Sequence, residues 1–517
     1  MTNAQNTPPA LKDLPPLSDK EQEKSAASTP PTLAQRAVRG SLWVALGSYS
    51  NIAFGFLANL ALTRILTPEH FGAFSYASFI VSLLNLRTRI PISYGFMQKK
   101  ETTAELIGTN LALNYLFSTA GLCLVGLAAP ILHLLGKPWE VAWLAMAMAS
   151  IGLIDSYSSL AAVLLDRDLR FGWTSMISSV AFPVSYLPAI WLGLHGYGPW
   201  SLLAQNFTYI VLSFPGVVWI SRRQVPHLWR LRWKFDQTLA KQLLKVGLTI
   251  SVGSVASLLV GTFDNFLIGT FVSLEALGFY DRAYRLAQWP TLLITNVISK
   301  TAIYTYARLQ DDPVRLSKTV TMTFWIITML GLPIAVGMFI AAPDLVTWFY
   351  EERWLPSATF LRFLVIFAVI QPLMGDAGFL FIAVGKQKKS VIIALVEASV
   401  LIVFGTAFTL RWGALGTCAA VGLTFLIGLT LTHRFVREIV AINLWEVWLA
   451  PALAAGLTLA GYFLLAPWLN LPAWPILGRL VFQGFYALLG YSVLVLLLLP
   501  RNTVQKFSYV WRLMFRT

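Results

Sequence analysis

The sequence predicts an all-α polytopic membrane protein of about fourteen transmembrane helices, with two pseudo-symmetric six-helix lobes followed by two C-terminal helices. The composition is 56% hydrophobic and 12% charged, and the mean hydropathy is +0.65; a soluble domain carries about 25% charged residues. From Ser41 to Pro500 the chain consists mainly of apolar stretches separated by short turns. Each stretch is long enough to cross a bilayer, which takes about 20 residues, and a lipid-exposed backbone satisfies its hydrogen bonds as a helix.

The spans follow one another along the chain with few long connections. We predict them at 41–62, 71–96, 106–130, 141–165, 174–194, 199–220, 247–270, 280–305, 319–342, 358–384, 390–410, 414–432, 446–467 and 475–499. This gives a disordered cytoplasmic tail at 1–33, an N-lobe at 34–220, a basic amphipathic linker at 221–246, a C-lobe at 247–440, two further spans within 441–500 and a cytoplasmic tail at 501–517. The linker includes His227–Phe235, whose apolar and basic residues indicate an interfacial helix on the inner leaflet or a docking site for a cytoplasmic partner.

The basic residues set the predicted orientation. Most of the 39 Lys and Arg residues fall in alternate connections and in the two tails. The other connections hold only Arg64, Lys137, Arg353 and Arg411. Because Lys and Arg collect on the cytoplasmic side, both termini are predicted to lie in the cytoplasm. The formal charge of +15 is accounted for by this bias and by contact with anionic membrane lipid, so no nucleic-acid partner is predicted.

An internal repeat relates the two lobes. Placing the first span on the seventh aligns several identical residues, and six intervening spans preserve the orientation. The aligned pairs are Leu42 with Leu248, Gly47 with Gly253, Ser48 with Ser254, Gly55 with Gly261, Asn59 with Asn265, Glu69 with Glu275, Gly72 with Gly278 and Ala77 with Ala283. This pattern is typical of a parallel repeat, in which cargo binds between two bundles that rock against each other.

Three segments carry a family resemblance: Gly40–Trp43, Arg64–Gly72 and Leu277–Pro290. Together they resemble the polysaccharide (Wzx-type flippase) branch of the multidrug/oligosaccharidyl-lipid/polysaccharide (MOP) exporter superfamily, over about residues 34–500. The resemblance implies a fold of two six-helix lobes in the bacterial inner membrane. It also implies movement of an undecaprenyl-pyrophosphate-linked oligosaccharide from the inner to the outer leaflet for surface or exopolysaccharide synthesis. Polysaccharide polymerase and export proteins are the implied partners.

Cations inside the predicted spans are the first candidates for the site. A charge at the centre of a bilayer costs about 2.5–3.5 kcal/mol, so such residues are expected to face a cavity. The predicted substrate-binding residues are Arg87, Arg89, Arg282, Arg285 and Lys300, with Trp289 to stack on sugar rings. Arginine suits pyrophosphate because its planar fork donates two parallel hydrogen bonds. The alternatives are a structural salt bridge from Arg87 to Asp155 and, for Arg282, an extension to the outer interface.

Carboxylates and amides inside the spans are the second set. Superfamily relatives use membrane carboxylates for ion coupling, so the resemblance makes Asp264 and Glu397 candidates for Na⁺ or H⁺ coupling. Asn265, beside Asp264, and Asp155 are further candidates, because a buried carboxylate with an amide neighbour can hold Na⁺ or titrate. The alternative is that these carboxylates compensate the charge of the arginines. No other cofactor and no metal site are predicted.

The chain is predicted not to be an enzyme. It has no Gly-rich phosphate loop, no helical His-Glu-x-x-His and no nucleophile elbow. A polysaccharide polymerase or ligase would need a sizeable outer loop with catalytic groups, and the longest outer segment here is 342–357. A multidrug exporter of the same superfamily is the other alternative, but an apolar cation would require an acidic cavity, whereas the intramembrane excess is basic.

Overall fold

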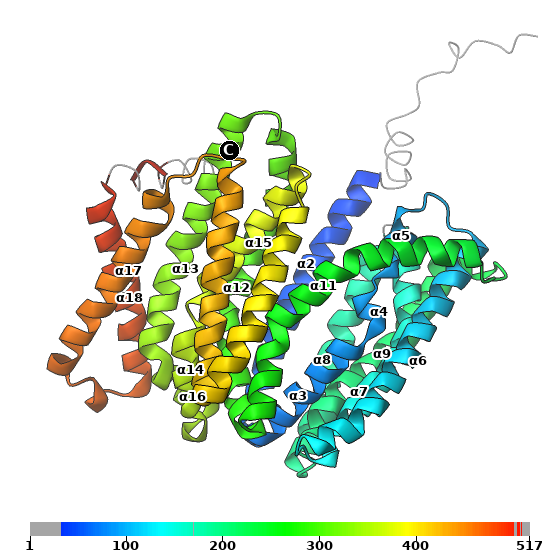
Figure 1. Ribbon diagram of the computed structural model, residues 1–517, viewed down its shortest axis with the longest axis horizontal. Coiled ribbons are helices and arrows are strands. Elements are labelled where there is room, and N and C mark those ends of the chain that lie inside the picture. Colours follow the sequence, from blue (N-terminus) through cyan, green and yellow to red (C-terminus); the bar gives the residue numbers. More distant parts are fainter. Residues whose placement is uncertain (1–32, 169, 501–503, 507, 509–517) are drawn as a thin grey trace, which may run out of the picture.

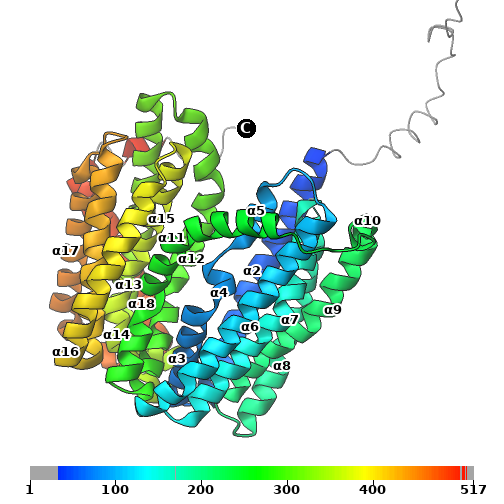
Figure 2. The ribbon, with the colours of Figure 1, turned by 45° about the vertical axis from the view of Figure 1, so that its right-hand side comes forward.

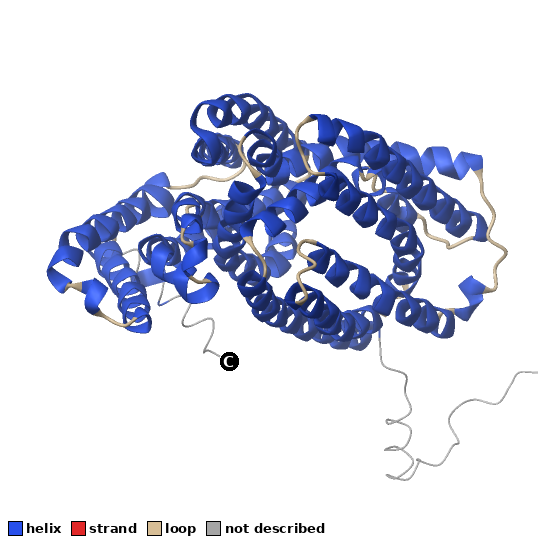
Figure 3. Cartoon of the chain, turned by 90° about the horizontal axis from the view of Figure 1, so that it is seen from below, coloured by secondary structure: helices blue, strands red, loops and turns tan. Residues whose placement is uncertain are grey.

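The computed structural model describes residues 33–168, 170–500, 504–506 and 508, without the side chains of 33–46, 171, 292–301 and 367–368. The described residues form helices and connecting loops, with no strand among them (Figure 3). The predicted tails, 1–33 and 501–517, fall almost entirely outside this range. The all-α fold class is therefore confirmed for the described chain.

The first lobe lies on the right of Figure 1 and is built from eight helical segments. These are α2 (Leu33–Ile65), α3 (Pro68–Leu84), α4 (Leu86–Arg89), α5 (Ile92–Gln98), α6 (Ala104–Leu134), α7 (Trp139–Arg167), α8 (Phe171–Leu194) and α9 (Trp200–Gln224). The long helices begin where the sequence offers local signals. Pro68 opens α3 after the N-cap Thr67, and the Thr103 side chain accepts a hydrogen bond from the Leu106 amide at the start of α6.

The second lobe lies on the left of Figure 1, and the last two long helices flank it. Its segments are α11 (Gln237–Phe271), α12 (Leu274–Leu309), α13 (Pro313–Tyr350), α14 (Pro356–Leu364), α15 (Phe367–Ala383) and α16 (Lys388–Arg437). The final helices, α17 (Ala450–Leu465) and α18 (Ile476–Leu498), both pack against α13. The tenth predicted span, 358–384, corresponds to α14 and α15 together.

The second predicted span, 71–96, is broken into α3, α4 and α5 instead of forming one helix. The breaks fall at Asn85 and at Ile90–Pro91, where the backbone leaves the helical region. Proline lacks an amide hydrogen and biases the preceding residue toward extended backbone, which accounts for the second break. Arg87 and Arg89 therefore lie in a four-residue helix with none of its residues fully buried.

Helix α16 contains two predicted spans, 390–410 and 414–432. They meet at Gly413, whose dihedral angles of φ 62° and ψ −144° turn the chain back on itself. Only glycine adopts this conformation without strain. The next turn is tightly packed as well, because a Cβ atom on Gly416 would meet the Phe408 carbonyl oxygen at 2.0 Å. The predicted outer turn at 411–413 is thus a sharp glycine corner.

Hydropathy separates the helices into two groups. In the part of the chain that is described, ten helical segments are long and apolar enough to cross a membrane. Helix α2, helix α12 and the broken segment α3–α5 are not among the ten. The described helices cover the predicted spans except in 71–96, where the helix is broken, and the number fourteen stays a prediction. The three exceptions are adjacent in the fold, since α3 packs against α12, and they supply polar groups at the interface between the lobes.

The lobes cross at two glycines that the repeat aligns with each other. A Cβ atom on Gly72 of α3 would lie 1.7 Å from the carbonyl oxygen of Leu274, and one on Gly278 of α12 would lie 1.8 Å from that of Pro68. The alignment pairs residue 72 with 278 and residue 68 with 274. Exchanging the two halves of the repeat therefore turns each of these contacts into the other. A pseudo-two-fold axis therefore passes through the α3–α12 crossing, where only glycine permits the backbones to approach.

A second pair of contacts closes the lobe interface on the predicted outer side, at the bottom of Figure 1. The Arg353 guanidinium donates to the carbonyl oxygens of Thr63, at 3.1 Å, and Arg64, at the end of α2. In the other direction, the Lys137 ammonium lies 3.5 Å from the carbonyl oxygen of Thr270, at the end of α11. Residue 64 aligns with residue 270 in the repeat. Each lobe thus caps the C-terminal end of the other lobe's first helix with a cation, a favourable contact for the helix dipole.

The linker between the lobes differs from the predicted interfacial helix. Only α10 (Pro226–Trp229) is helical between α9 and α11. The following residues are held by the first lobe: the Lys234 amide donates to the Ala104 carbonyl oxygen at 3.3 Å, and the Asp236 amide donates to Thr109 Oγ1 at 2.9 Å. Helix α11 then runs from the first lobe across to the second (Figure 2).

Candidate functional site

A cavity of about 430 Å³ lies between the lobes, with α2 and α8 on one side and α12 and α13 on the other. This volume is within the range of small-molecule sites in proteins. Its lining residues are Asn51, Ile52, Gly55, Phe56, Asn59, Leu60, Phe182, Tyr186, Arg282, Arg285, Gln288, Trp289 and Tyr350. Three of the six predicted substrate-binding residues, Arg282, Arg285 and Trp289, are brought together here.

Helix α2 presents a polar stripe to the cavity through Asn51, Gly55 and Asn59. These residues are four positions apart and so share one helix face. The Asn59 amide group donates to the Gly55 carbonyl oxygen at 2.8 Å and to the Tyr186 hydroxyl of α8 at 3.1 Å. The Asn51 Oδ1 atom is buried without a hydrogen-bond partner among the described residues. Asn59 thus makes an interhelical hydrogen bond, and Asn51 retains an unused acceptor.

Helix α12 supplies three charged groups within just over one turn: Asp281, Arg282 and Arg285. The Asp281 Oδ2 atom accepts hydrogen bonds from Arg282 at 2.5 Å and 3.0 Å and from Arg285 Nε at 3.0 Å. Asp281 and Arg285 are four residues apart, the spacing at which side chains meet on a helix. One carboxylate therefore serves two guanidinium groups, and the cluster keeps a formal charge of one positive.

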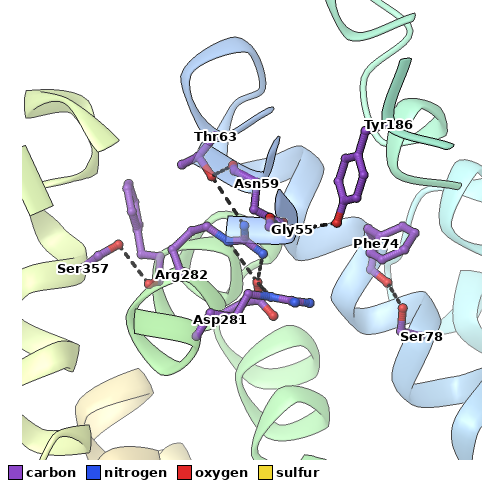
Figure 4. A network of polar contacts seen from close by, with 11 residues as sticks. Gly55, Asn59, Thr63, Phe74, Ser78, Tyr186, Asp281, Arg282 and Ser357 are labelled. Carbon is purple, nitrogen blue, oxygen red and sulfur yellow. Dashed lines mark hydrogen bonds and ion pairs between the residues drawn. The ribbon is translucent and has the colours of Figure 1, made fainter. Parts of the chain in front are cut away.

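The two arginines have different exposures, which gives them different roles. The Arg282 side chain is 2% exposed and donates to Thr63 Oγ1 at 3.4 Å (Figure 4). Its guanidinium carbon lies 3.9 Å from the centroid of the Phe71 ring. It is sealed between the lobes and does not extend to the outer interface. The Arg285 side chain is 49% exposed. Arg285 is thus the accessible cation, and Arg282 is the buried anchor.

Trp289 forms an aromatic wall of the cavity. Its ring centroid lies 3.9 Å from that of Phe56, and Phe56 in turn meets Phe349 edge-on at 5.4 Å. Phe56 comes from the first lobe and the other two from the second. The wall therefore spans the interface and offers flat apolar surface beside the cations, an arrangement suited to a sugar ring next to a phosphate.

Arg87 and Arg89 lie away from this cavity. The Arg87 guanidinium forms an ion pair with Asp155 of α7 and donates to Ser159 Oγ at 3.1 Å, so the structural salt bridge weighed as the alternative is present. Arg89 donates to the Ser254 carbonyl oxygen of α11 at 3.2 Å. The Lys300 side chain lies outside the described residues. A role in substrate binding stays a prediction for all three.

The ion pair leads to a prediction for a mutant cycle. Arg87→Ala leaves the Asp155 carboxylate without its partner, and we expect the protein to lose on the order of 2 kcal/mol of stability. The double variant Arg87→Ala/Asp155→Ala removes both charges and should recover most of the loss. Thermal unfolding of the purified variants measures this, with Arg89→Ala as the control. A double variant that is no more stable than Arg87→Ala would contradict the structural role of the ion pair.

The predicted coupling residues are dispersed over three helices. Asp264 of α11 is buried, accepts from the Tyr280 hydroxyl at 2.5 Å and accepts from the Asn265 amide at 2.8 Å. Glu397 of α16 is also buried, and its Oε1 atom has no hydrogen-bond partner among the described residues. Asp155 is engaged by Arg87. The described residues contain no cluster of three or more His, Cys, Asp or Glu side chains that could hold a metal ion.

Sequence reasoning missed Asp281, the residue that organises the cluster. Its signal was available in the segment Leu277–Pro290, where Asp281 precedes Arg282 directly and Arg285 by four positions. It also missed the contributions of Tyr186, Gln288 and Tyr350 to the lining. Tyr186 and Tyr350 had no comparable signal, because their part in the cavity depends on how α8 and α13 pack against the other lobe.

Comparison with known proteins gives a family match and several structural neighbours. A family described as "Polysaccharide biosynthesis protein" matches residues 61–359. The succinoglycan biosynthesis transport protein ExoT of Rhizobium meliloti (strain 1021) is 24% identical over 330 residues, which cover 63% of this chain and 65% of that protein. The match thus spans slightly less than two thirds of that relative.

Two solved structures share the fold. The lipid II flippase MurJ in an inward closed conformation has a TM-score of 0.69 at 14% identity, and the match covers 90% of this chain and 100% of that one. A multidrug resistance MATE family transporter of the MOP superfamily, in an inward-facing conformation, has a TM-score of 0.57 at 15% identity. This match covers 74% of the present chain and 95% of the transporter. At these identities the likeness shows the fold alone.

Proposed function

Because this chain belongs to the polysaccharide biosynthesis protein family, we propose that it moves an undecaprenyl-pyrophosphate-linked oligosaccharide from the inner to the outer leaflet of the bacterial cytoplasmic membrane. The membership confirms the resemblance to the polysaccharide branch of the MOP superfamily. The role is transport, with no covalent chemistry. Polysaccharide polymerase and export proteins are the partners that would act on the delivered cargo.

The Arg285 side chain is the observation that carries the proposal. It is half exposed and lines the cavity between the lobes, and among the described residues its one carboxylate partner, Asp281, is shared with Arg282. The cluster therefore keeps one net positive charge, which can attract an anionic ligand into the cavity. Arginine binds phosphate groups through paired hydrogen bonds, and in a site of low dielectric such a contact is strong. A pyrophosphate beside Arg285 would place the attached sugars near Trp289 and Phe56.

The closed outer side supports loading from the inner leaflet. Both cation caps and the glycine crossing join the lobes toward the predicted outer surface. A cargo that enters between the lobes from the inner side would reach Arg285 before it meets these contacts. Release would require the caps at Thr63 and Thr270 to open, which is the rocking motion expected of two repeats.

Glu397 is the strongest candidate for ion coupling within this proposal. Both Asp264 oxygens accept hydrogen bonds, and Asp155 is paired with Arg87. Glu397, by contrast, is buried with one oxygen unpartnered, so it has a free position for a proton or Na⁺. Ion coupling is tested by measuring transport under imposed Na⁺ and proton gradients, and indifference to both would contradict it.

Deletion of the gene in its host tests the function. We expect surface polysaccharide to disappear and lipid-linked oligosaccharide to accumulate where reagents added outside the cell cannot modify it. Expression of the wild-type chain should reverse both effects. Normal surface polysaccharide in the deletion strain, or loss of the lipid-linked precursor itself, would contradict the proposal, since the second result indicates a synthetic enzyme.

A further inference from the structure

A second cavity lies on the flank of the protein, away from the interface between the lobes. Its volume is about 660 Å³, and it is formed by the last turns of α16 and by the chain that enters α17. Its lining residues are Leu429, Thr430, His433, Arg434, Arg437, Leu444, Trp448, Leu449 and Ala452. The predicted topology places this region at the inner face of the membrane.

Apart from Thr430, which donates to the Leu426 carbonyl oxygen, the polar side chains of this cavity include cations and ring nitrogens without a partner among the described residues. Arg434 and Arg437 are three residues apart, so they share a helix face, and no ion pair to either is found within the described chain. The Trp448 Nε1 atom and the His433 Nε2 atom are buried and unpartnered there, although the His433 side chain is 9% exposed. No carboxylate lines the cavity. Unused donors and cations indicate an anionic acceptor.

The backbone at Trp448 is unusual as well. Residues Trp445–Leu449 form a π-helix, which then continues as α17. Such segments are rare and are frequent at functional sites. Trp448 lines the cavity, while Val447, next to it, is fully buried. The site is therefore built by local backbone geometry in addition to surface charge.

The rest of the lining is apolar, through Leu429, Leu444, Leu449 and Ala452. A ligand that combines an anionic head with an apolar chain fits both the basic and the apolar part of the lining. We propose that this cavity binds the phosphate headgroup of an anionic phospholipid of the inner leaflet, with an acyl chain against the leucines. Basic pockets between helices on the cytoplasmic side bind such lipids in other membrane proteins.

Other occupants fit less well. A soluble phosphate would leave the apolar lining exposed. The transported cargo is assigned to the cavity at Arg285, which is built from α2, α8, α12 and α13 and shares no lining residue with this one. Arg434 and Arg437 also lie in the last turn of α16, where cations favour the helix dipole. A favourable contact with the helix dipole does not require a bound lipid. Measuring lipid binding therefore distinguishes this role from the proposed lipid site.

Native mass spectrometry of the delipidated full chain, titrated with phosphatidylglycerol, tests the proposal. We expect Arg434→Gln/Arg437→Gln to weaken binding about 25-fold, because each basic side chain near an anionic lipid contributes about a fivefold factor. Trp448→Phe keeps the ring but removes the donor, and we expect about a tenfold loss. Arg222→Gln/Arg223→Gln is the matched control, because these arginines end α9 and already stack on Trp229 and Trp219.

The outcomes are distinct. Loss of affinity in the two cavity variants, with wild-type affinity in the control, supports the site. Equal affinity in all variants, or an equal loss in the control, overturns it. Displacement of the lipid by undecaprenyl phosphate at lower concentration would assign the cavity to the cargo, and displacement by millimolar inorganic phosphate would assign it to a soluble anion. Should the arginine variant not fold, Trp448→Phe decides alone. None of these readouts depends on transport.

Discussion

Replacing Arg285 with glutamine should reduce export of the lipid-linked oligosaccharide about tenfold or more while the protein remains folded. A hydrogen bond to a charged group contributes about 1.5–3 kcal/mol, and Arg285 is the half-exposed cation of the inter-lobe cavity. Its loss leaves Asp281 paired with Arg282, so the cluster becomes neutral. Transport of a fluorescent lipid-linked oligosaccharide in proteoliposomes measures the effect, and thermal unfolding checks the fold.

Two further variants sharpen this experiment. Arg285→Lys keeps the charge but not the planar fork, so we expect partial activity. Arg308→Gln removes an exposed charge from the last turn of the same helix and should leave transport unchanged. Full activity of Arg285→Gln would remove the cavity from the mechanism. If that variant instead gained export of cationic dyes, the chain would act as a multidrug exporter.

Replacing Gly72 or Gly278 with alanine should have the second large effect, through packing alone. The new Cβ atom would lie 1.7 Å or 1.8 Å from a backbone carbonyl oxygen, much closer than atoms can approach. Neither partner is a flexible side chain, so α3 and α12 must move apart. Overpacking of this kind costs about 1–3 kcal/mol or more. Since the crossing joins the lobes, we expect lower thermal stability and loss of export together.

Gly126→Ala is the matched control for these variants. Gly126 lies within α6, and nothing is found within 4 Å of an added Cβ atom. Alanine there should be neutral or stabilising, because it has the higher helix propensity by about 1 kcal/mol. Unfolding temperatures of the three variants in detergent give the comparison. Wild-type stability and transport in Gly72→Ala and Gly278→Ala would show that the lobes do not meet at this crossing.

The candidate site could be predicted in part because charged residues in spans are rare. Arg282, Arg285 and Trp289 were identified from the sequence, and the structure places them in one cavity. Arg87 was identified by the same argument, yet its partner is Asp155, a residue 68 positions away in the chain. An intramembrane cation must meet either a cavity or a counter-charge, and the sequence does not distinguish the two cases.

The sequence by itself determined the class of fold, the positions of the helices and the pairing of the repeats. These depend on hydropathy, on proline and glycine, and on identities such as Gly72 with Gly278, all of which are local or periodic. Only the tertiary structure decided that Arg282 is buried and that Arg285 is accessible. It also decided that cations from opposite lobes close the outer side. The exposure of Arg285 and the contacts between the lobes are set by helices distant in sequence, so no local pattern contains them.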